Sequence, residues 1–155
     1  MLGALRAASH AERYDDGADR EELFAASCTA FFARELAVEE PFVRAWLAFE
    51  AHGAEADGAV TPVNEPLGTA ALTVFPSLPR ITTTGPVLDA RVRNVYVVPA
   101  ARRRGIARAL MRAVMDEVES LGGVDLLTLG ASAQGRPLYV SLGFVPKADE
   151  MVLGS

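Results

Sequence analysis

The sequence predicts a single α/β domain whose core is a pair of parallel strands covered by helices. The length of 155 residues fits one domain. Half of the residues are hydrophobic and 23% are charged, as in globular proteins, which excludes disordered, collagen-like and coiled-coil chains. Two apolar, strand-like runs in the second half are each followed by a helical pattern, which is typical of parallel strands joined through helices.

The first half of the chain is predicted to contain two helices, between residues 19 and 52. Asp19 and Glu22 have the spacing of a helix capping box. The apolar residues of this first helix recur at helical spacing, at Phe24, Cys28 and Phe31. A second helix is expected to begin at Pro41, which suits a first helical turn, and to end at Gly53. Its apolar stripe consists of Phe42, Trp46 and Phe49.

Residues 66–153 are predicted to form the sheet and the helices that cover it. Strands are expected at 68–75, 88–98, 124–129 and 144–153, and helices at 106–121 and 137–142. Pro99 ends the longest strand, and a Gly-Gly pair at 122 closes the longer helix. Residues 81–86 are expected to be a loop or a short strand. Residues 1–18 are Ala-rich and contain no β-rich run.

The charge of the chain is distributed unevenly. The formal net charge is -5. Residues 91–112 contain seven arginines and no acidic residue, so this window carries +7 and the rest of the chain -12. The arginines are Arg91, Arg93, Arg102, Arg103, Arg104, Arg108 and Arg112. A dense basic segment in an acidic protein indicates that an anion binds there.

The turn at residues 97–107 leads from a hydrophobic strand directly into a helix. A helix N-terminus carries unpaired N–H groups and a partial positive charge, so the arginines at 102–104 are unfavourable for the helix unless an anion occupies the turn. Gly105 and Ala107 let the backbone approach that anion closely, and a pyrophosphate fits better than a single carboxylate. P-loop and dinucleotide-binding spacings are absent. The alternative is that the arginines are solvated and Gly105 only eases the turn.

This turn resembles the acyl-CoA-binding signature of the GNAT superfamily of N-acetyltransferases, with Arg102-x-x-Gly105-x-Ala107 in the place of [QR]-x-x-G-x-[GA]. Residues 129–144 resemble the strand and LY-x-x-x-GF element of the same family. The resemblance implies one N-acetyltransferase domain over residues 1–155. It also implies a central mixed, twisted sheet flanked by helices, in which a splayed pair of parallel strands binds acyl-CoA.

The resemblance also implies roles for individual residues. The strand backbone before the turn would hold the pantetheine arm, and the amides of residues 103–108 would cradle the pyrophosphate. Tyr139 matches the tyrosine that protonates the departing thiolate. The residues expected to bind acetyl-CoA are Val97, Val98, Arg102, Arg103, Arg104, Gly105, Ile106, Ala107, Arg108, Ser132, Gly135 and Arg136. Ser132 and Gly135 stand where many members have Asn and Ala.

The implied reaction is direct attack of a primary amine, of a small molecule or a protein, on the acetyl thioester in a ternary complex. Family members often carry a Glu or His base at the strand positions of Arg91 and Arg93, and arginine cannot serve as one. We hypothesise that Arg91 or Arg93 faces the acceptor and pairs with a carboxylate; the alternative is that both face solvent. Asn94 and Tyr96 are expected on the opposite strand face, or in the cleft if the strand bulges.

Two other functions remain open from the sequence. A non-catalytic acyl-CoA-binding module would share the fold; the missing strand base favours it slightly, whereas Tyr139 opposes it. Nucleic-acid binding is disfavoured because the basic window offers only Tyr96 for base stacking.

The remaining expectations concern location and partners. The chain has one cysteine, Cys28, so we expect no disulfide framework, no metal site and a reducing, cytoplasmic setting. We expect no secretory signal and no membrane span. A homodimer remains open.

Overall fold

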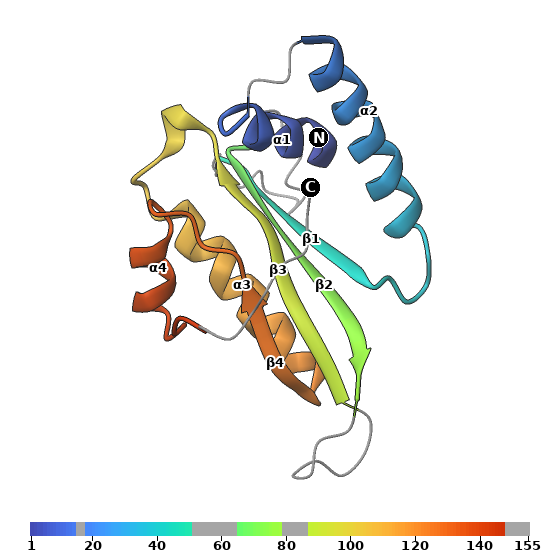
Figure 1. Ribbon diagram of the computed structural model, residues 1–155, viewed down its shortest axis with the longest axis vertical. Helices are drawn as coiled ribbons and strands as arrows, with labels where there is room; N and C mark the ends of the chain where they lie inside the picture. Colours follow the sequence, from blue (N-terminus) through green and yellow to red (C-terminus); the bar gives the residue numbers. More distant parts are fainter. Residues whose placement is uncertain (15–17, 51–64, 79–86, 148–155) are drawn as a thin grey trace, which may run out of the picture.

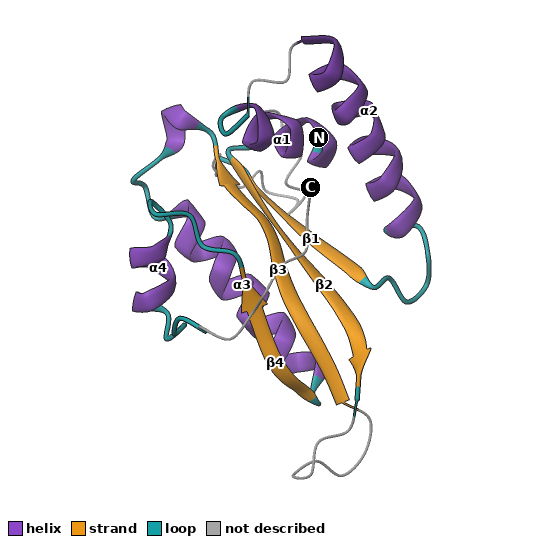
Figure 2. Cartoon of the chain, in the orientation of Figure 1, coloured by secondary structure: helices purple, strands orange, loops and turns teal. Residues whose placement is uncertain are grey.

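A computed structural model describes residues 1–14, 18–50, 65–78 and 87–147. It contains a four-stranded mixed sheet in the order β1-β2-β3-β4, flanked by helices (Figure 1 and Figure 2). The strands are β1 (Val43–Ala48), β2 (Gly68–Ser77), β3 (Val87–Val97) and β4 (Val124–Leu129). The first two pairings are antiparallel, and β3 pairs with β4 in parallel. The predicted α/β class and parallel strand pair are therefore confirmed.

The parallel strands separate at one end. Their pairing runs from Leu88 opposite Val124 to Val92 opposite Leu129. Beyond this point β4 ends, so residues 93–97 of β3 have no partner on that side among the described strands. This is the splayed pair that the family resemblance implied, and it leaves backbone hydrogen-bonding groups of β3 facing an open space.

A β-bulge interrupts β3 within the splayed segment. Tyr96 lies opposite Thr69 and Arg93 opposite Ala71, so β3 has one more residue than β2 between these pairs. Asn94 adopts a φ of 52°, which is uncommon for a residue other than glycine. The extra residue reverses the alternation of side chains, so Tyr96 lies on the same face of the sheet as Arg93. Of the two expectations for Asn94 and Tyr96, the structure therefore matches the second, in which the strand bulges and both residues line the cleft.

The helix α3 (Ile106–Leu121) covers one face of the sheet and builds the main core. Its N-cap is Gly105 and its C-cap is Gly122. Met111 and Val114 are fully buried against Leu72 and its neighbours. Each of these side chains stabilises the fold by ~1.5–3 kcal/mol through removal of apolar surface from water.

Two helices, α1 (Leu2–Ala11) and α2 (Ala18–Glu35), pack together on the other face of the sheet (Figure 1). Phe32 of α2 contacts Val43 and Ala71 there. A short 3-10 helix, η1 (Pro99–Ala101), follows β3, and α4 (Arg136–Ser141) follows β4. None of the helices in the described ranges is long and apolar enough to cross a membrane.

The prediction of two helices between residues 19 and 52 is wrong in its second helix. Residues 43–48 form the strand β1 instead. Val43 and Ala45 pack towards α2, whereas Trp46 and Ala48 pack on the main core, so both faces of the strand are apolar and the two-residue period is hidden. The sequence analysis also missed α1, whose Ala-rich segment has high helix propensity but a weak apolar pattern.

The C-terminal strand predicted at 144–153 is not found in its described part. Residues 144–147 have no regular structure, and residues 148–153 lie outside the described residues. The loop or strand expected at 81–86 lies outside them as well, as does the predicted helix end at Gly53.

Candidate active site

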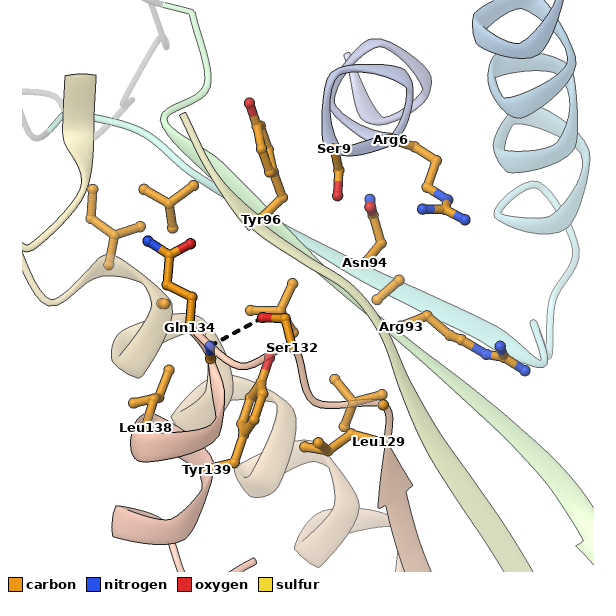
Figure 3. A pocket seen from close by; sticks show the side chains of 18 of the residues that line it. Arg6, Ser9, Arg93, Asn94, Tyr96, Leu129, Ser132, Gln134, Leu138 and Tyr139 are labelled. Carbon is orange, nitrogen blue, oxygen red and sulfur yellow. Dashed lines mark hydrogen bonds between the residues drawn. The ribbon is translucent and has the colours of Figure 1, made fainter. Parts of the chain in front are cut away.

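A groove of about 1340 Å³ lies where β3 and β4 separate. One wall is formed by α1 and α2, and the opposite wall by the turn after β3, the loop 130–135 and α4 (Figure 3). The expected site residues that line it are Arg91, Arg93, Asn94, Val97, Arg102, Arg103, Gly105, Ile106, Ala107, Arg108, Ser132, Gly135 and Tyr139. Val98, Arg104 and Arg136 do not line it.

The turn between η1 and α3 presents free backbone donors. Gly105 has a φ of 83° and no side chain caps the helix. In the described part of the chain, the N–H groups of residues 103–108 have no protein acceptor, whereas the next N–H, of Ala109, donates to the carbonyl of Gly105. A Cβ at Gly105 would meet no atom within 4 Å, so the space beside the turn is open. These donors, together with the positive end of the α3 dipole, fit an anion such as a pyrophosphate.

Two of the three consecutive arginines are engaged by carboxylates from elsewhere in the chain. Arg102 donates to both carboxylate oxygens of Glu12, at 2.6 Å each, and its Nε donates to the Val97 carbonyl at 3.1 Å. Arg104 forms an ion pair with Glu50, outside the groove. Arg103 adopts a φ of 65° and is exposed. All three side chains were expected at the anion from the sequence, but those of Arg102 and Arg104 bind protein carboxylates instead.

Val98 also differs from its expected role. Its N–H donates to the Leu67 carbonyl at 2.9 Å, and its carbonyl accepts from the N–H of Ala101. The Val98 N–H is therefore used within the fold, and the residue does not line the groove.

Glu12 is a groove residue that the sequence analysis missed. It caps the C-terminus of α1, accepts from the Tyr96 hydroxyl at 2.8 Å and pairs with Arg102. The hydrogen bond from Arg102 lowers the pKa of Glu12, and burial together with the bond to Glu12 raises the pKa of Tyr96. This network joins α1 to the end of β3 across 84 residues of sequence, so no local signal could have identified it.

Tyr139 lies on α4 with its ring buried and its hydroxyl directed toward the groove beside Ser132 (Figure 3). The ring packs edge-on against Phe144, with centroids 6.1 Å apart. Burial raises the pKa of Tyr139, so its phenol remains protonated well above neutral pH. A phenol in this state can donate a proton to a leaving group in the groove.

The loop 130–135 positions Tyr139. The Ser132 hydroxyl accepts from the Gly135 N–H at 3.1 Å, and the Ser132 carbonyl accepts from the Arg136 N–H at 2.9 Å. A Cβ at Gly135 would lie 3.0 Å from Tyr139 Cε2 and 3.2 Å from Ser132 Oγ. Glycine at this position therefore allows the loop to approach the tyrosine ring closely.

The other half of the groove lies beneath α1. The side-chain amide atoms of Asn94 are buried there without a protein hydrogen bond (Figure 3). Such a group costs about 1–3 kcal/mol unless water or a ligand satisfies it. The described residues contain no cluster of three or more His, Cys, Asp or Glu side chains that could hold a metal ion.

Comparisons with solved structures show what this fold resembles. A predicted acetyltransferase from Clostridium acetobutylicum, solved with acetyl-CoA, matches with a TM-score of 0.72 and 20% identity over 99% of this chain and 87% of that one. A GCN5-related N-acetyltransferase from Ralstonia eutropha JMP134 matches with a TM-score of 0.70 and 24% identity, covering 99% and 90%. Glucosamine-6-phosphate N-acetyltransferase from Arabidopsis thaliana matches with a TM-score of 0.62 and 15% identity, covering 84% and 78%.

At these identities the structural matches establish the fold alone. A search of curated protein sequences finds no match. The model of the acetyltransferase (GNAT) domain matches residues 46–146, which include the splayed strands, the turn before α3 and α4. The chain therefore belongs to the GNAT acetyltransferase family.

Proposed function

We propose that this protein transfers an acetyl group from acetyl-CoA to a primary amine, of a small molecule or a protein, with both substrates bound together. The observation that carries the proposal is the run of N–H groups at residues 103–108 without protein acceptors, which opens onto the unpaired edge of β3. The similar structure from Clostridium acetobutylicum was solved with acetyl-CoA, and the similar enzyme from Arabidopsis thaliana acts on a primary amine, glucosamine-6-phosphate.

The diphosphate of acetyl-CoA would bind at the turn, through the amides of residues 103–108 and the arginines that line the groove. The pantetheine arm would follow the free edge of β3 near Val97. A strand N–H there would polarise the thioester carbonyl, and a fixed donor of this kind lowers a barrier by a few kcal/mol. Ser132, Gly135 and Tyr139 would form the wall next to the sulfur. Arg104 and Arg136 do not line the groove, so they would contact acetyl-CoA only at the edge of its binding site.

The chemical step forms one bond and breaks one. The amine nitrogen attacks the thioester carbon, the C–S bond breaks, and the Tyr139 hydroxyl gives its proton to the thiolate. The amine loses a proton to water, water returns a proton to the Tyr139 oxygen, and the products are an N-acetyl amine and CoA. Among the described residues that line the groove, Glu12 is the carboxylate, and its bonds to Arg102 and Tyr96 together with its lowered pKa make it a poor base. We therefore expect the free amine to react, with a rate that rises with pH toward the amine pKa of about 10.

The test is a panel of primary amines with acetyl-CoA, in which CoA release is followed with a thiol reagent and the N-acetyl product by mass spectrometry. Tyr139→Phe should lower kcat by about 10²–10⁴-fold and leave the Kd of acetyl-CoA unchanged. Tyr14→Phe is the matched control, because Tyr14 is exposed and does not line the groove. Binding of acetyl-CoA with no turnover of any amine would instead support a non-catalytic acyl-CoA-binding module.

A further inference from the structure

The groove contains more positive charge than acetyl-CoA can account for. Its described lining includes seven arginines and one carboxylate, Glu12. The arginines are Arg6, Arg13, Arg91, Arg93, Arg102, Arg103 and Arg108. Arg102 and Arg103 lie in the turn before α3, where a diphosphate would bind, and Arg108 lies in the first turn of α3 and donates to the Ser141 hydroxyl. Glu12 is bound to Arg102, so it neutralises none of the arginines at the other end of the groove.

Three arginines form a second cluster, across the sheet from α3 and below α1. Arg91 pairs with Thr73 and Arg93 with Ala71, and Thr73 in turn pairs with Val43, so all of these residues share the face that α1 and α2 cover. Arg6, on α1, lines the same groove, and its side chain lies on the same side of Asn94 as that of Arg93 (Figure 3). The guanidinium of Arg6 also lies over the Phe24 ring of α2, with Cζ 5.5 Å from its centroid, so it is held at this end of the groove.

Among the described residues, these three guanidinium groups, of Arg6, Arg91 and Arg93, have no carboxylate partner. Burial lowers the pKa of Arg93, and the positive charges of Arg91 and Arg6 lower it further. An uncompensated group of like charges destabilises the protein, and a bound anion would remove that cost through charge-assisted hydrogen bonds.

The position of the cluster along β3 sets the distance between the anion and the reacting amine. Arg93 and Val97 pair with Ala71 and Gly68, which are three residues or ~10 Å apart on β2, and the long side chain of Arg93 can span part of that distance. An acceptor that reaches both points needs a spacer of several bonds between its amine and its anionic group.

We propose that Arg6, Arg91 and Arg93 form an anion subsite that selects a small acceptor amine carrying a carboxylate or phosphate group. This inference rests on the proposed acetyl transfer and adds the chemical class of the acceptor. Arg6 was not singled out in the sequence, since only packing of α1 on the sheet brings it to the strand arginines.

The test compares four amines that differ at the end remote from the reacting nitrogen. These probes are 5-aminopentanoate, 4-aminobutyl phosphate, pentylamine and 1,5-diaminopentane. We expect kcat/KM for at least one anionic amine to exceed that for pentylamine by about 10–100-fold, as charge-assisted hydrogen bonds imply, with the diamine poorest. Whichever of the two anionic probes has the higher kcat/KM shows whether the subsite prefers a carboxylate or a phosphate group. In Arg93→Gln this selectivity should fall about tenfold or more, chiefly through the acceptor KM. Arg112→Gln, an exposed change on α3 outside the groove, should keep it.

A binding measurement separates failure of the subsite from failure of the transfer reaction. With CoA present, calorimetry should show N-acetyl-5-aminopentanoate or its phosphate counterpart binding more tightly than N-pentylacetamide, and Arg93→Gln should abolish the difference. If no amine is acetylated but this difference is found, the subsite stands and the transfer reaction does not. If pentylamine or the diamine reacts as well as both anionic amines, or the acetylated products bind equally, the subsite is refuted.

Discussion

Gly105 begins α3 with a φ of 83°, and the substitution Gly105→Ala tests whether its turn binds acetyl-CoA. The left-handed conformation costs an L-residue about 1–2 kcal/mol, so the free energy of unfolding should fall by that amount. The added Cβ meets no protein atom within 4 Å, so no clash contributes to the loss. The same methyl group would occupy the open space beside the turn, where the diphosphate is proposed to bind. Loss of one charge-assisted hydrogen bond to the diphosphate should raise the Kd of acetyl-CoA about 10–100-fold.

Gly122→Ala is the matched control at the opposite end of the same helix. Gly122 has a φ of 60° and a ψ of 158°, a region that is essentially restricted to glycine, and a Cβ there also meets no atom within 4 Å. This variant should lose at least as much stability as Gly105→Ala, yet Gly122 lies outside the groove. Its affinity for acetyl-CoA should therefore equal that of the wild type.

Chemical denaturation measures the stability of both variants, and calorimetric titration measures the affinity for acetyl-CoA. The reasoning predicts two destabilised proteins, of which only Gly105→Ala binds weakly. Tight, wild-type binding by Gly105→Ala would refute a diphosphate site at this turn. Equal weakening in both variants would show that instability, and not the added methyl group, reduces the affinity.

Two further predictions concern the walls of the groove. Gly135→Ala should displace the Tyr139 ring by a few tenths of an ångström, because the added Cβ would lie 3.0 Å from that ring. We expect kcat to fall, while the Kd of acetyl-CoA changes less. An unchanged kcat would show that the exact position of the ring does not matter. Glu12→Gln should cost about 1 kcal/mol or less at neutral pH, since the pair with Arg102 is about one-third exposed. Folding lowers the pKa of Glu12. The difference in free energy of unfolding between this variant and the wild type should therefore reach its full size above the unfolded pKa of 4.5, and it should be lost as the pH falls from there through the lower pKa of the folded protein. Denaturation curves at several pH values measure this, and a difference that grows in acid would contradict the assigned pairing.

The central part of the site could be predicted from the sequence because its determinants are local. Pro99 follows the end of β3, Gly105 provides the left-handed cap, and the apolar stripe through Val114 forms the buried face of α3. Each signal acts within a few residues of the element that it specifies. Tyr139 was located in the same way, from a short motif on α4.

The secondary structure of the N-terminal region could not be predicted from such local signals. The segment around Trp46 is apolar on both faces because the sheet is covered on both sides, and this pattern is compatible with a helix as well as with a buried strand. Only pairing with β2 makes it the strand β1. The bulge at Asn94, which moves Tyr96 to the face of the arginines, likewise depends on the register between two strands.

The sequence by itself predicted the α/β class and the parallel strand pair, and its resemblance to the GNAT family pointed to the turn before α3 and to Tyr139, both of which line the groove. The tertiary structure alone decided that Glu12 binds Arg102, 90 residues away, and that Arg6 joins Arg91 and Arg93 in one cluster. The physical reason for this division is the distance along the chain over which each interaction acts. Backbone propensity and helix capping act between residues that are neighbours in the sequence. Ion pairs and uncompensated charges instead depend on which surfaces are brought together when α1 packs on the sheet.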